Sequence, residues 1–242
     1  MMSGSDQAYY DQEFVPSPVA HGQWMEEIRS YFSNYASRLN LALESTEGKI
    51  AELGAGSCGL SLCLSELPNA RNIYAVDISL SRMQRMLEFS ASILGGKIDM
   101  VQTIACDFNG VLPFSDGELD AVVFDAALHH SRSIWGTLTE CHRVLRDGGV
   151  LIAQREAYLS PLRAASQIKR LLSTPEIAAN VSENIYLREQ YLYYLAVNGF
   201  DAEFIPHSIG WLKKLLKVFN GSLFSDGVLY ARKKKARQSM AF

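Results

Sequence analysis

The sequence predicts an α/β fold, in which a doubly wound parallel sheet carries helices on both faces. From about residue 49 onward, short apolar runs rich in β-branched residues alternate with longer stretches of helical periodicity. The runs are apolar throughout, as expected for strands that are covered on both sides. With 242 residues, of which 48% are hydrophobic and 20% charged, the chain can bury one domain-sized core.

Five of the apolar runs are predicted strands, at 49–54, 72–78, 100–106, 119–124 and 149–154. Apolar side chains at helical spacing follow the first, second and fourth runs, near Leu64, Leu87 and Leu138. This alternation is the pattern of strand–helix–strand units that build a parallel sheet.

The N-terminal region has a different pattern. Residues 1–22 are polar and aromatic, whereas residues 23–43 carry apolar side chains at helical spacing. We therefore expect a helical N-terminal cap over residues 1–45, in which Tyr9 and Tyr10 either cover a bound ligand or anchor the terminus to the surface.

The C-terminal part is predicted to complete the same domain, since no internal repeat or low-complexity linker separates it. Pro175 interrupts one helical pattern, and Asn198-Gly199 is a typical helix end. The expected elements are an interrupted helix at 160–180, a helix at 187–197, strands at 202–206 and 227–232, and a basic amphipathic helix at 209–219.

The charge and the cysteine content of the chain argue against several classes of protein. Lys and Arg total 23 against 26 Asp and Glu, so the net charge of −3 gives no long-range attraction for nucleic acid or an acidic membrane. The four cysteines show no C-x-x-C spacing, and we expect them reduced, with no metal site. No segment is apolar enough for a membrane span or a secretory leader, which predicts a soluble, cytoplasmic protein.

A glycine loop follows the first predicted strand, in the pattern Gly54-x-Gly56-x-x-Gly59. Glycines permit a tight strand-to-helix turn and let backbone N–H groups approach a ligand. The second predicted strand ends at Asp77, where a carboxylate can accept hydrogen bonds from ribose hydroxyls. Together these features predict a nucleotide site.

The kind of nucleotide depends on the flanking residues. The glycine spacing alone also fits a dinucleotide site, which keeps an NAD-dependent oxidoreductase open. However, Glu52 precedes the loop, where its carboxylate would repel a pyrophosphate and attract an α-amino group. Asp107 and Phe108 follow the third strand and offer a carboxylate for an adenine amino group and a ring for its face.

With these features the sequence resembles the class I S-adenosylmethionine-dependent methyltransferases. Five motifs carry the resemblance in the family's order, at 52–59, 75–78, 106–109, 119–130 and 143–151. It implies a Rossmann-like, doubly wound sheet of seven strands, mostly parallel with an antiparallel last strand. It also implies S-adenosylmethionine as cofactor and S-adenosylhomocysteine as product. One departure is Cys58, where the family often has glycine.

The resemblance assigns cofactor contacts to residues at the strand ends. It places Gly54, Ala55 and Gly56 along the methionine and ribose, Asp77 on the ribose, Ile78 against the adenine, Asp107 and Phe108 at the adenine edge and face, and Asp125 near the methionine.

A pair of histidines, His129 and His130, follows the fourth strand, at the expected mouth of the site. An imidazole titrates near neutral pH and can accept a proton from a hydroxyl as its oxygen attacks the sulfonium methyl. Glu156 follows the neighbouring fifth strand and could orient a histidine. We hypothesise that His129 is the general base, Glu156 orients it and His130 is the alternative base; packing or capping roles stay open for both histidines.

These expectations combine into one methyltransferase domain. Its parts are the cap at 1–45, a cofactor-binding core at 49–155, a substrate lid at 157–187 and a C-terminal part of the sheet at 188–235. The expected acceptor is a small molecule with a hydroxyl group, and no nucleic acid or membrane partner is expected. N- or C-methylation and a catalytically silent cofactor-binding protein remain alternatives, and both monomer and homodimer stay open.

Overall fold

The fold is a seven-stranded sheet between layers of helices, as the sequence predicts. The computed structural model describes residues 4–11, 17–179, 181–207 and 227–235, so the helix expected at 209–219 lies outside the described residues. The strands are β1 Lys49–Leu53, β2 Asn72–Asp77, β3 Val101–Ala105, β4 Leu119–Asp125, β5 Leu145–Gln154, β6 Phe200–Pro206 and β7 Gly227–Lys233.

The strand order β3-β2-β1-β4-β5-β7-β6 confirms a doubly wound arrangement. Strands β1 to β5 pair in parallel, and β7 runs antiparallel to both of its neighbours, β5 and β6. The mostly parallel sheet with an antiparallel last strand is therefore confirmed. The chain order reverses between β1 and β4, and crevices for ligands form at such a switch point.

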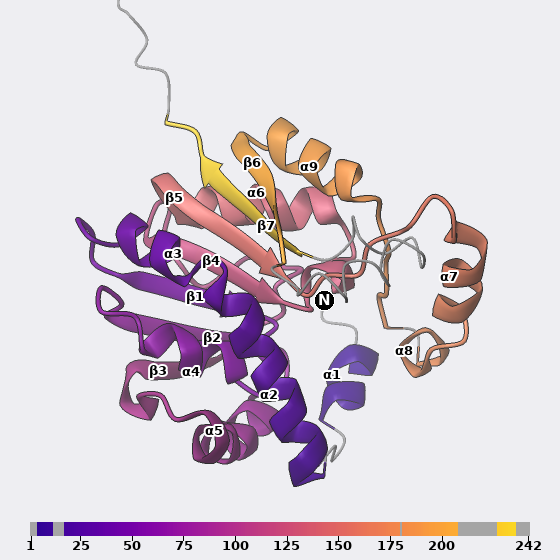
Figure 1. Cartoon of the computed structure of the whole chain (residues 1–242), viewed down its shortest axis with the longest axis horizontal. Helices are drawn as coiled ribbons and strands as arrows, with labels where there is room; N and C mark the ends of the chain where they lie inside the picture. Colours follow the sequence, from indigo (N-terminus) through magenta and orange to yellow (C-terminus); the bar gives the residue numbers. More distant parts are fainter. Residues whose placement is uncertain (1–3, 12–16, 180, 208–226, 236–242) are drawn as a thin grey trace, which may run out of the picture.

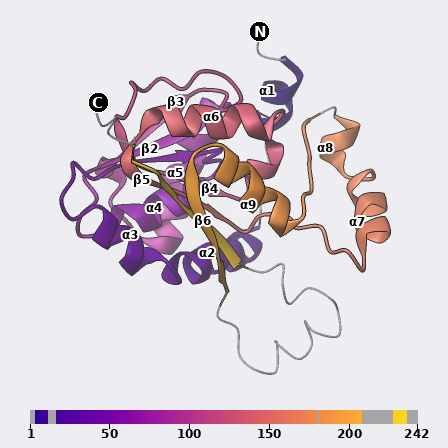
Figure 2. The ribbon, with the colours of Figure 1, turned by 90° about the horizontal axis from the view of Figure 1, so that it is seen from above.

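Helices cover both faces of the sheet (Figures 1 and 2). One face carries α2 Pro18–Ser33, α3 Ala36–Ala42, α4 Gly59–Ser65 and α5 Leu80–Leu94, and the other carries α6 Ile134–Val144 and α9 Arg188–Val197. Alternate strand residues enter two buried clusters, so that Ile50 packs on the first side and Ala51 on the second.

Three short helices lie beyond the carboxyl ends of the parallel strands (Figure 1). They are α1 Gly4–Tyr10, α7 Ala164–Leu171 and α8 Pro175–Ala178. Two 3₁₀ turns complete the described elements, η1 Ile98–Met100 and η2 Leu128–His130. None of the helices in the described ranges is long and apolar enough to cross a membrane.

Several predicted element boundaries shift in the structure. β5 begins at Leu145 rather than at residue 149, because Leu145 pairs with Leu119 before an irregularity around the Gly148 turn. The helical pattern at 23–43 forms two helices, the first starting at Pro18 behind the N-cap Ser17. Pro175 begins α8, where its fixed φ suits a first helical turn.

Cys58 adopts a conformation that explains why glycine suits this position. Its φ of 60° and ψ of 20° lie in the left-handed region, and its side chain is fully buried at the start of α4. The next residue, Gly59, must be small, because a Cβ there would come within 2.8 Å of the Met25 sulfur on α2. The loop is thus tightly enclosed on its inner side.

Candidate active site

A cavity opens at the carboxyl ends of β1, β2 and β4, at the switch point of the sheet. It holds about 910 Å³ of space free of protein atoms, which includes open solvent at its mouth. The sheet side is lined by residues 54–57, 77–78, 106–109 and 125–127. The outer side is lined by Tyr10, Trp24, Arg82, His130, Val181 and Ser182.

The glycine loop forms the inner wall of this cavity. The backbone N–H groups of Gly54 and Ala55 both donate to the Val76 carbonyl, at 2.8 and 3.0 Å, which ties the loop to β2. Gly54 has a φ of +74°, and a Cβ there would lie 2.6 Å from the Ala127 Cβ. Only glycine permits both this conformation and this close approach.

Asp77 projects from the end of β2 next to the loop. Its Oδ2 accepts a hydrogen bond from the Gly56 N–H and its Oδ1 from the Ser79 N–H, both at 2.9 Å. Burial raises the pKa of this carboxyl, although the two backbone donors oppose the shift. The carboxylate is held rigidly and keeps free lone pairs, and with Ile78 it lines the cavity.

Asp107 and Phe108 line a neighbouring wall. The Asn109 N–H donates to Asp107 Oδ1 at 2.9 Å, and the Arg132 guanidinium pairs with Asp107 Oδ2. Phe108 packs edge-on against Phe124, with ring centroids 5.8 Å apart. The structure thus brings both residues to the same cavity as Asp77.

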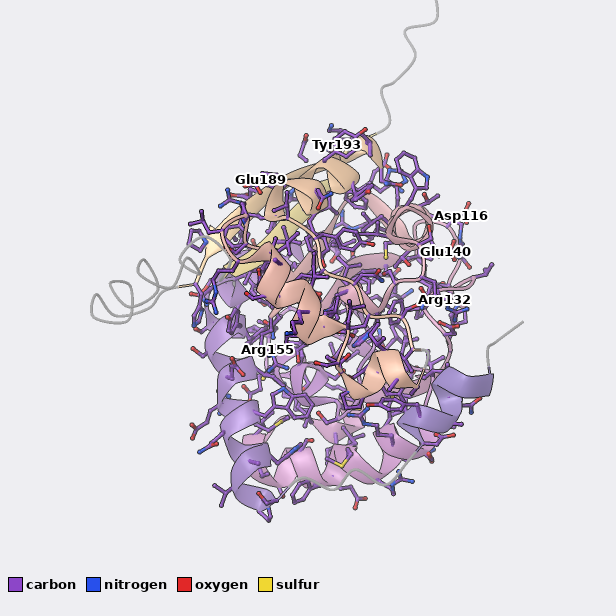
Figure 3. All side chains as sticks on the ribbon, turned by 90° about the vertical axis from the view of Figure 1, so that its right-hand side faces the viewer. Asp116, Arg132, Glu140, Arg155, Glu189 and Tyr193 are labelled. Atoms are coloured by element: carbon purple, nitrogen blue, oxygen red, sulfur yellow. The ribbon has the colours of Figure 1, made fainter. Side chains whose placement is uncertain are left out.

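Asp125, at the end of β4, is neutralised by a buried cation. Arg155 donates to both of its carboxylate oxygens at 2.7 Å, and the Gln154 amide donates to Oδ1 at 2.9 Å. Arg155 has a φ of +55°, a strained conformation, and its buried guanidinium lies between Asp125 and the Trp24 ring. Figure 3 shows the molecule from the right-hand side of Figure 1, with Arg155 and Arg132 labelled.

Three of the predicted site residues, Glu52, His129 and Glu156, do not line the cavity. Glu52 is buried within β1 and accepts hydrogen bonds from the backbone N–H and hydroxyl of Ser61 on α4. Burial raises the pKa of its carboxyl to about 8, against the effect of the Ser61 bonds. In this position Glu52 supports the first turn of α4 behind the loop.

His129 and Glu156 come together as a hydrogen-bonded pair, with 2.7 Å between His129 Nδ1 and Glu156 Oε2. Glu156 also accepts the backbone N–H groups of Ala127, Leu128 and His129 at 3.0–3.1 Å, and its side chain is fully buried. Burial lowers the pKa of His129, but the Glu156 carboxylate outweighs it and the pKa is raised. The turn η2 is therefore built around one carboxylate.

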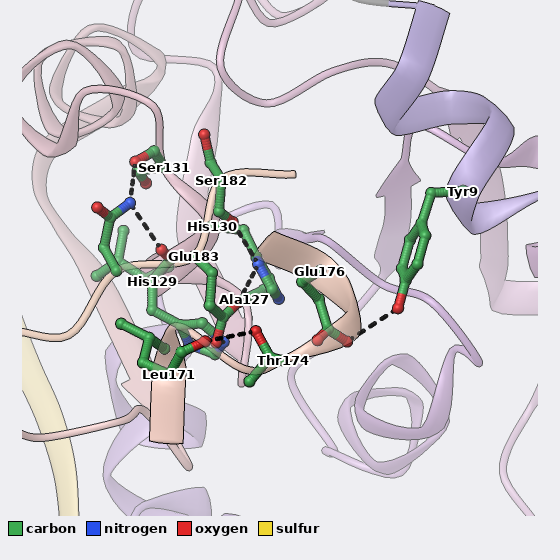
Figure 4. Close-up of polar contacts among 12 residues, drawn as sticks. Tyr9, Ala127, His129, His130, Ser131, Leu171, Thr174, Glu176, Ser182 and Glu183 are labelled. Carbon is green, nitrogen blue, oxygen red and sulfur yellow. Dashed lines mark hydrogen bonds and ion pairs between the residues drawn. The ribbon is translucent and has the colours of Figure 1, made fainter. Parts of the chain in front are cut away.

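Glu183 is the site residue that sequence reasoning missed. It lies in the segment after α8, with Oε2 2.9 Å from His130 Nδ1 and Oε1 3.8 Å from His129 Nε2 (Figure 4). His130 Nδ1 also lies 2.9 Å from the Ser182 carbonyl oxygen. The three side chains offer one ligand atom each within 4.8 Å of one another, close enough to hold a metal ion. No local spacing in the sequence connects residues 130 and 183.

The segment that carries Glu183 is fastened to the histidine turn. The Asn184 N–H donates to the His129 carbonyl at 3.0 Å, and its side-chain amide donates to the His129 and Ser131 carbonyls. At the far end of the same segment, the Tyr9 hydroxyl on α1 donates to Glu176 at 3.1 Å (Figure 4). The N-terminal cap and the predicted lid therefore meet beside the cavity.

Comparisons with known proteins agree with this arrangement. Residues 51–153 match a family described as a methyltransferase domain. An uncharacterized chloroplastic methyltransferase of Arabidopsis thaliana is 30% identical over 141 residues, covering 56% of this chain and 39% of that protein. The chain thus spans about two fifths of the length of this curated relative.

Two solved structures share the fold. A putative S-adenosylmethionine-dependent methyltransferase from Listeria monocytogenes has a TM-score of 0.62 at 15% identity, covering 86% of this chain and 99% of that one. A geranyl diphosphate methyltransferase, solved with GPP and sinefungin, has a TM-score of 0.58 at 18% identity, covering 83% and 76%. At these identities the likeness establishes the fold.

Proposed function

We propose that the chain is a class I S-adenosylmethionine-dependent methyltransferase that transfers the methyl group of S-adenosylmethionine to a small-molecule acceptor. One observation carries the proposal: the family's motif residues meet in a single cavity at the switch point of the sheet.

The cavity fits the cofactor in shape and donor set. A Cβ at Gly56 would find no atom nearer than the Arg82 guanidinium at 3.8 Å, so the loop backbone faces open space. Carboxylates and apolar side chains alternate along the cavity wall, as an adenosyl group with its polar ribose requires.

The proposed cofactor contacts follow the residues at the strand ends. Glu52 is assigned a supporting role behind the loop, since Ser61 occupies its carboxylate. The direct contacts are Gly54, Ala55 and Gly56 to the methionine and ribose, Asp77 to the ribose hydroxyls, Ile78 and Phe108 to the adenine faces, Asp107 to the adenine amino group, and Asp125 with Arg155 to the methionine end.

For the reaction we propose O-methylation with His129 as general base. The bound cofactor supplies an activated methyl group on a sulfonium. Glu156 holds the His129 Nδ1–H, which leaves the Nε2 lone pair for the proton of an acceptor hydroxyl. A C–O bond forms as the C–S bond breaks, and the hydroxyl proton passes to His129 Nε2. His130, which lines the cavity, is the alternative base.

The acceptor is proposed to be a small molecule in place of a nucleic acid. Arg132 and Arg155 are paired with Asp107 and Asp125, which leaves Arg82 as the arginine that lines the cavity. The net charge of −3 adds no long-range attraction for a polyanion. The lid at 157–187 is proposed to select the acceptor. The cytoplasmic location expected from the sequence is also a proposal, since the similar Arabidopsis protein is chloroplastic.

The decisive experiment separates cofactor binding from turnover. Isothermal titration should show binding of S-adenosylhomocysteine and none of NAD. His129→Ala should retain S-adenosylhomocysteine affinity and lose at least a hundredfold in methyl transfer to a panel of hydroxyl acceptors. Normal turnover in this variant would contradict the base assignment. Tight cofactor binding with no transfer to hydroxyl, amine or carbon acceptors would favour a silent binding protein.

A further inference from the structure

We propose that His129, His130 and Glu183 form a binding site for one divalent transition-metal ion, with zinc as the best match. Each of the three residues offers one ligand atom within 4.8 Å of the other two. The histidine atoms that face the Glu183 carboxylate are His129 Nε2 and His130 Nδ1. Two imidazoles and one carboxylate are a donor set that proteins use for catalytic zinc, with a fourth position open to water.

The separations between these atoms suit an ion at their centre. Ligand atoms bound to zinc at about 2.0–2.2 Å lie roughly 3.3 Å apart in a tetrahedron. The observed separations are 2.9 Å between His130 Nδ1 and Glu183 Oε2 and 3.8 Å between His129 Nε2 and Glu183 Oε1, so the carboxylate presents one oxygen to each histidine.

The histidine turn is already organised for metal binding. Glu156 holds His129 Nδ1 at 2.7 Å, so the lone pair of Nε2 points away from Glu156 and toward Glu183. A carboxylate behind a ligating histidine is the usual second partner in such sites, where it fixes the tautomer and raises the basicity of the ligand. His130 Nδ1 would give up the proton that it shares with the Ser182 carbonyl at 2.9 Å.

The charge at Glu183 calls for a cation. Its side chain is only 13% exposed, and its Oε2 atom faces His130 Nδ1 at 2.9 Å. Once His130 Nδ1 is deprotonated, this carboxylate oxygen loses its donor, and a largely buried carboxylate without a donor or cation is costly. With both imidazoles neutral, Glu183 and Glu156 carry two negative charges around the cluster, which a divalent ion would balance.

The bound ion would regulate the site described above. It takes the same Nε2 lone pair that the proposed base uses, so metal occupancy and proton acceptance by His129 exclude each other. Metal-loaded protein is therefore expected to be inactive until the ion is removed. This consequence rests on the proposed function, whereas the metal site itself does not.

The test uses the full chain, stripped with a chelator and titrated with Co²⁺ in the absence of S-adenosylmethionine. Tetrahedral Co²⁺ with nitrogen and oxygen ligands absorbs visible light, so we expect an absorption band that saturates at one equivalent and disappears on addition of Zn²⁺. Glu183→Gln and His130→Ala should each weaken Co²⁺ binding at least tenfold. The matched controls Glu189→Gln and His142→Ala, at positions outside the cluster, should bind Co²⁺ as the wild type does.

Each outcome decides the proposal. Absence of the absorption band, or equal Co²⁺ affinity in Glu183→Gln and the wild type, would overturn it, with circular dichroism confirming that the variants are folded. The readout needs no methyl transfer, so a failed acceptor screen leaves the metal result standing. Conversely, if Co²⁺ does not bind, the effect of His129→Ala on turnover still tests the proposed general base independently.

Discussion

Glu156 shows how one side chain can organise a site. It is fully buried and accepts three backbone N–H groups of the η2 turn as well as the His129 imidazole. Four donors on one carboxylate compensate for its removal from water. The position of His129 therefore depends on a residue from the end of the neighbouring strand.

Replacing Glu156 tests this dependence. In Glu156→Gln one oxygen becomes an NH₂ group that faces backbone donors, so at least one buried N–H loses its acceptor. We expect the free energy of unfolding to fall by about 3 kcal/mol, measured by urea denaturation. Glu189→Gln is the matched control, because the Glu189 side chain is 63% exposed. Equal stability of both variants would refute the organising role.

The buried carboxyl group of Glu52 should make the stability of the protein depend on pH. Burial raises the pKa of its carboxyl to about 8 in the folded state, above about 4.5 in the unfolded chain. A raised folded pKa contributes stability that is fully present below the unfolded pKa and is lost as pH rises through the folded value. Wild type should therefore lose stability relative to Glu52→Gln between about pH 5 and 8, at up to about 1.4 kcal/mol per pH unit.

Urea denaturation of both proteins at several pH values measures this difference. The two stability curves should diverge up to about pH 8 and run parallel above it. Curves that stay parallel from pH 5 to 9 would show that Glu52 is ionised throughout in the folded state.

At the residue scale, the sequence predicted the positions that follow strands. Asp77, Asp107 and Asp125 reach one cavity because the carboxyl ends of parallel strands meet at one edge of the sheet. Glu52 was expected at the mouth and instead lies inward, toward Ser61, because side chains alternate between the two faces of a strand. Glu183 could not be predicted, since an irregular segment brings it to His130 without any local pattern.

At the scale of elements, the N-terminal helix α1 contributes directly to the site. Tyr10, its last residue, lines the cavity, with its ring 6.2 Å from the His130 ring and 5.9 Å from the Arg82 guanidinium. Tyr9 next to it joins α1 to Glu176 on α8. Two of the three helices beyond the strand ends, α1 and α8, are thereby linked by a side-chain hydrogen bond.

Truncating Tyr10 should weaken cofactor binding without unfolding the sheet. Tyr10→Ala removes an aromatic wall of the cavity, and we expect the Kd for S-adenosylhomocysteine to rise about tenfold in isothermal titration. Tyr193→Ala is the matched control, because Tyr193 on α9 is 62% exposed and does not line the cavity. An unchanged Kd in Tyr10→Ala would confine α1 to a role in anchoring the terminus.

The sequence predicted the type and order of the strands and helices well, but it predicted the residues at which they begin and end less well. The five parallel strands were found because strands buried on both faces are apolar without interruption. The early start of β5 was hidden, because its first residues, 146–149, are charged or glycine. The division of the helix at 23–43 was hidden as well, since the apolar spacing continues across Asn34 and Tyr35.

At the scale of the whole molecule, the site draws on both halves of the sheet. β1 and β2 with their glycine loop lie on one side of the switch point, and β4 and β5 with the histidine turn lie on the other. The apolar clusters on the two faces hold these halves together. A ligand in the cavity contacts both halves at once, so its binding energy should stabilise the complete fold.

This coupling yields a prediction for the thermal stability of the complete protein. A ligand present at 100 times its Kd stabilises the folded state by about 2.7 kcal/mol, provided that it does not bind the unfolded chain. For a domain of this size that corresponds to a rise in Tm of roughly 5–10 °C. We expect S-adenosylhomocysteine to produce this rise in differential scanning calorimetry, in a single transition, and NAD at the same concentration to produce none. A rise with NAD would restore the dinucleotide interpretation of the glycine spacing, and a split transition would show that the two halves of the sheet unfold separately.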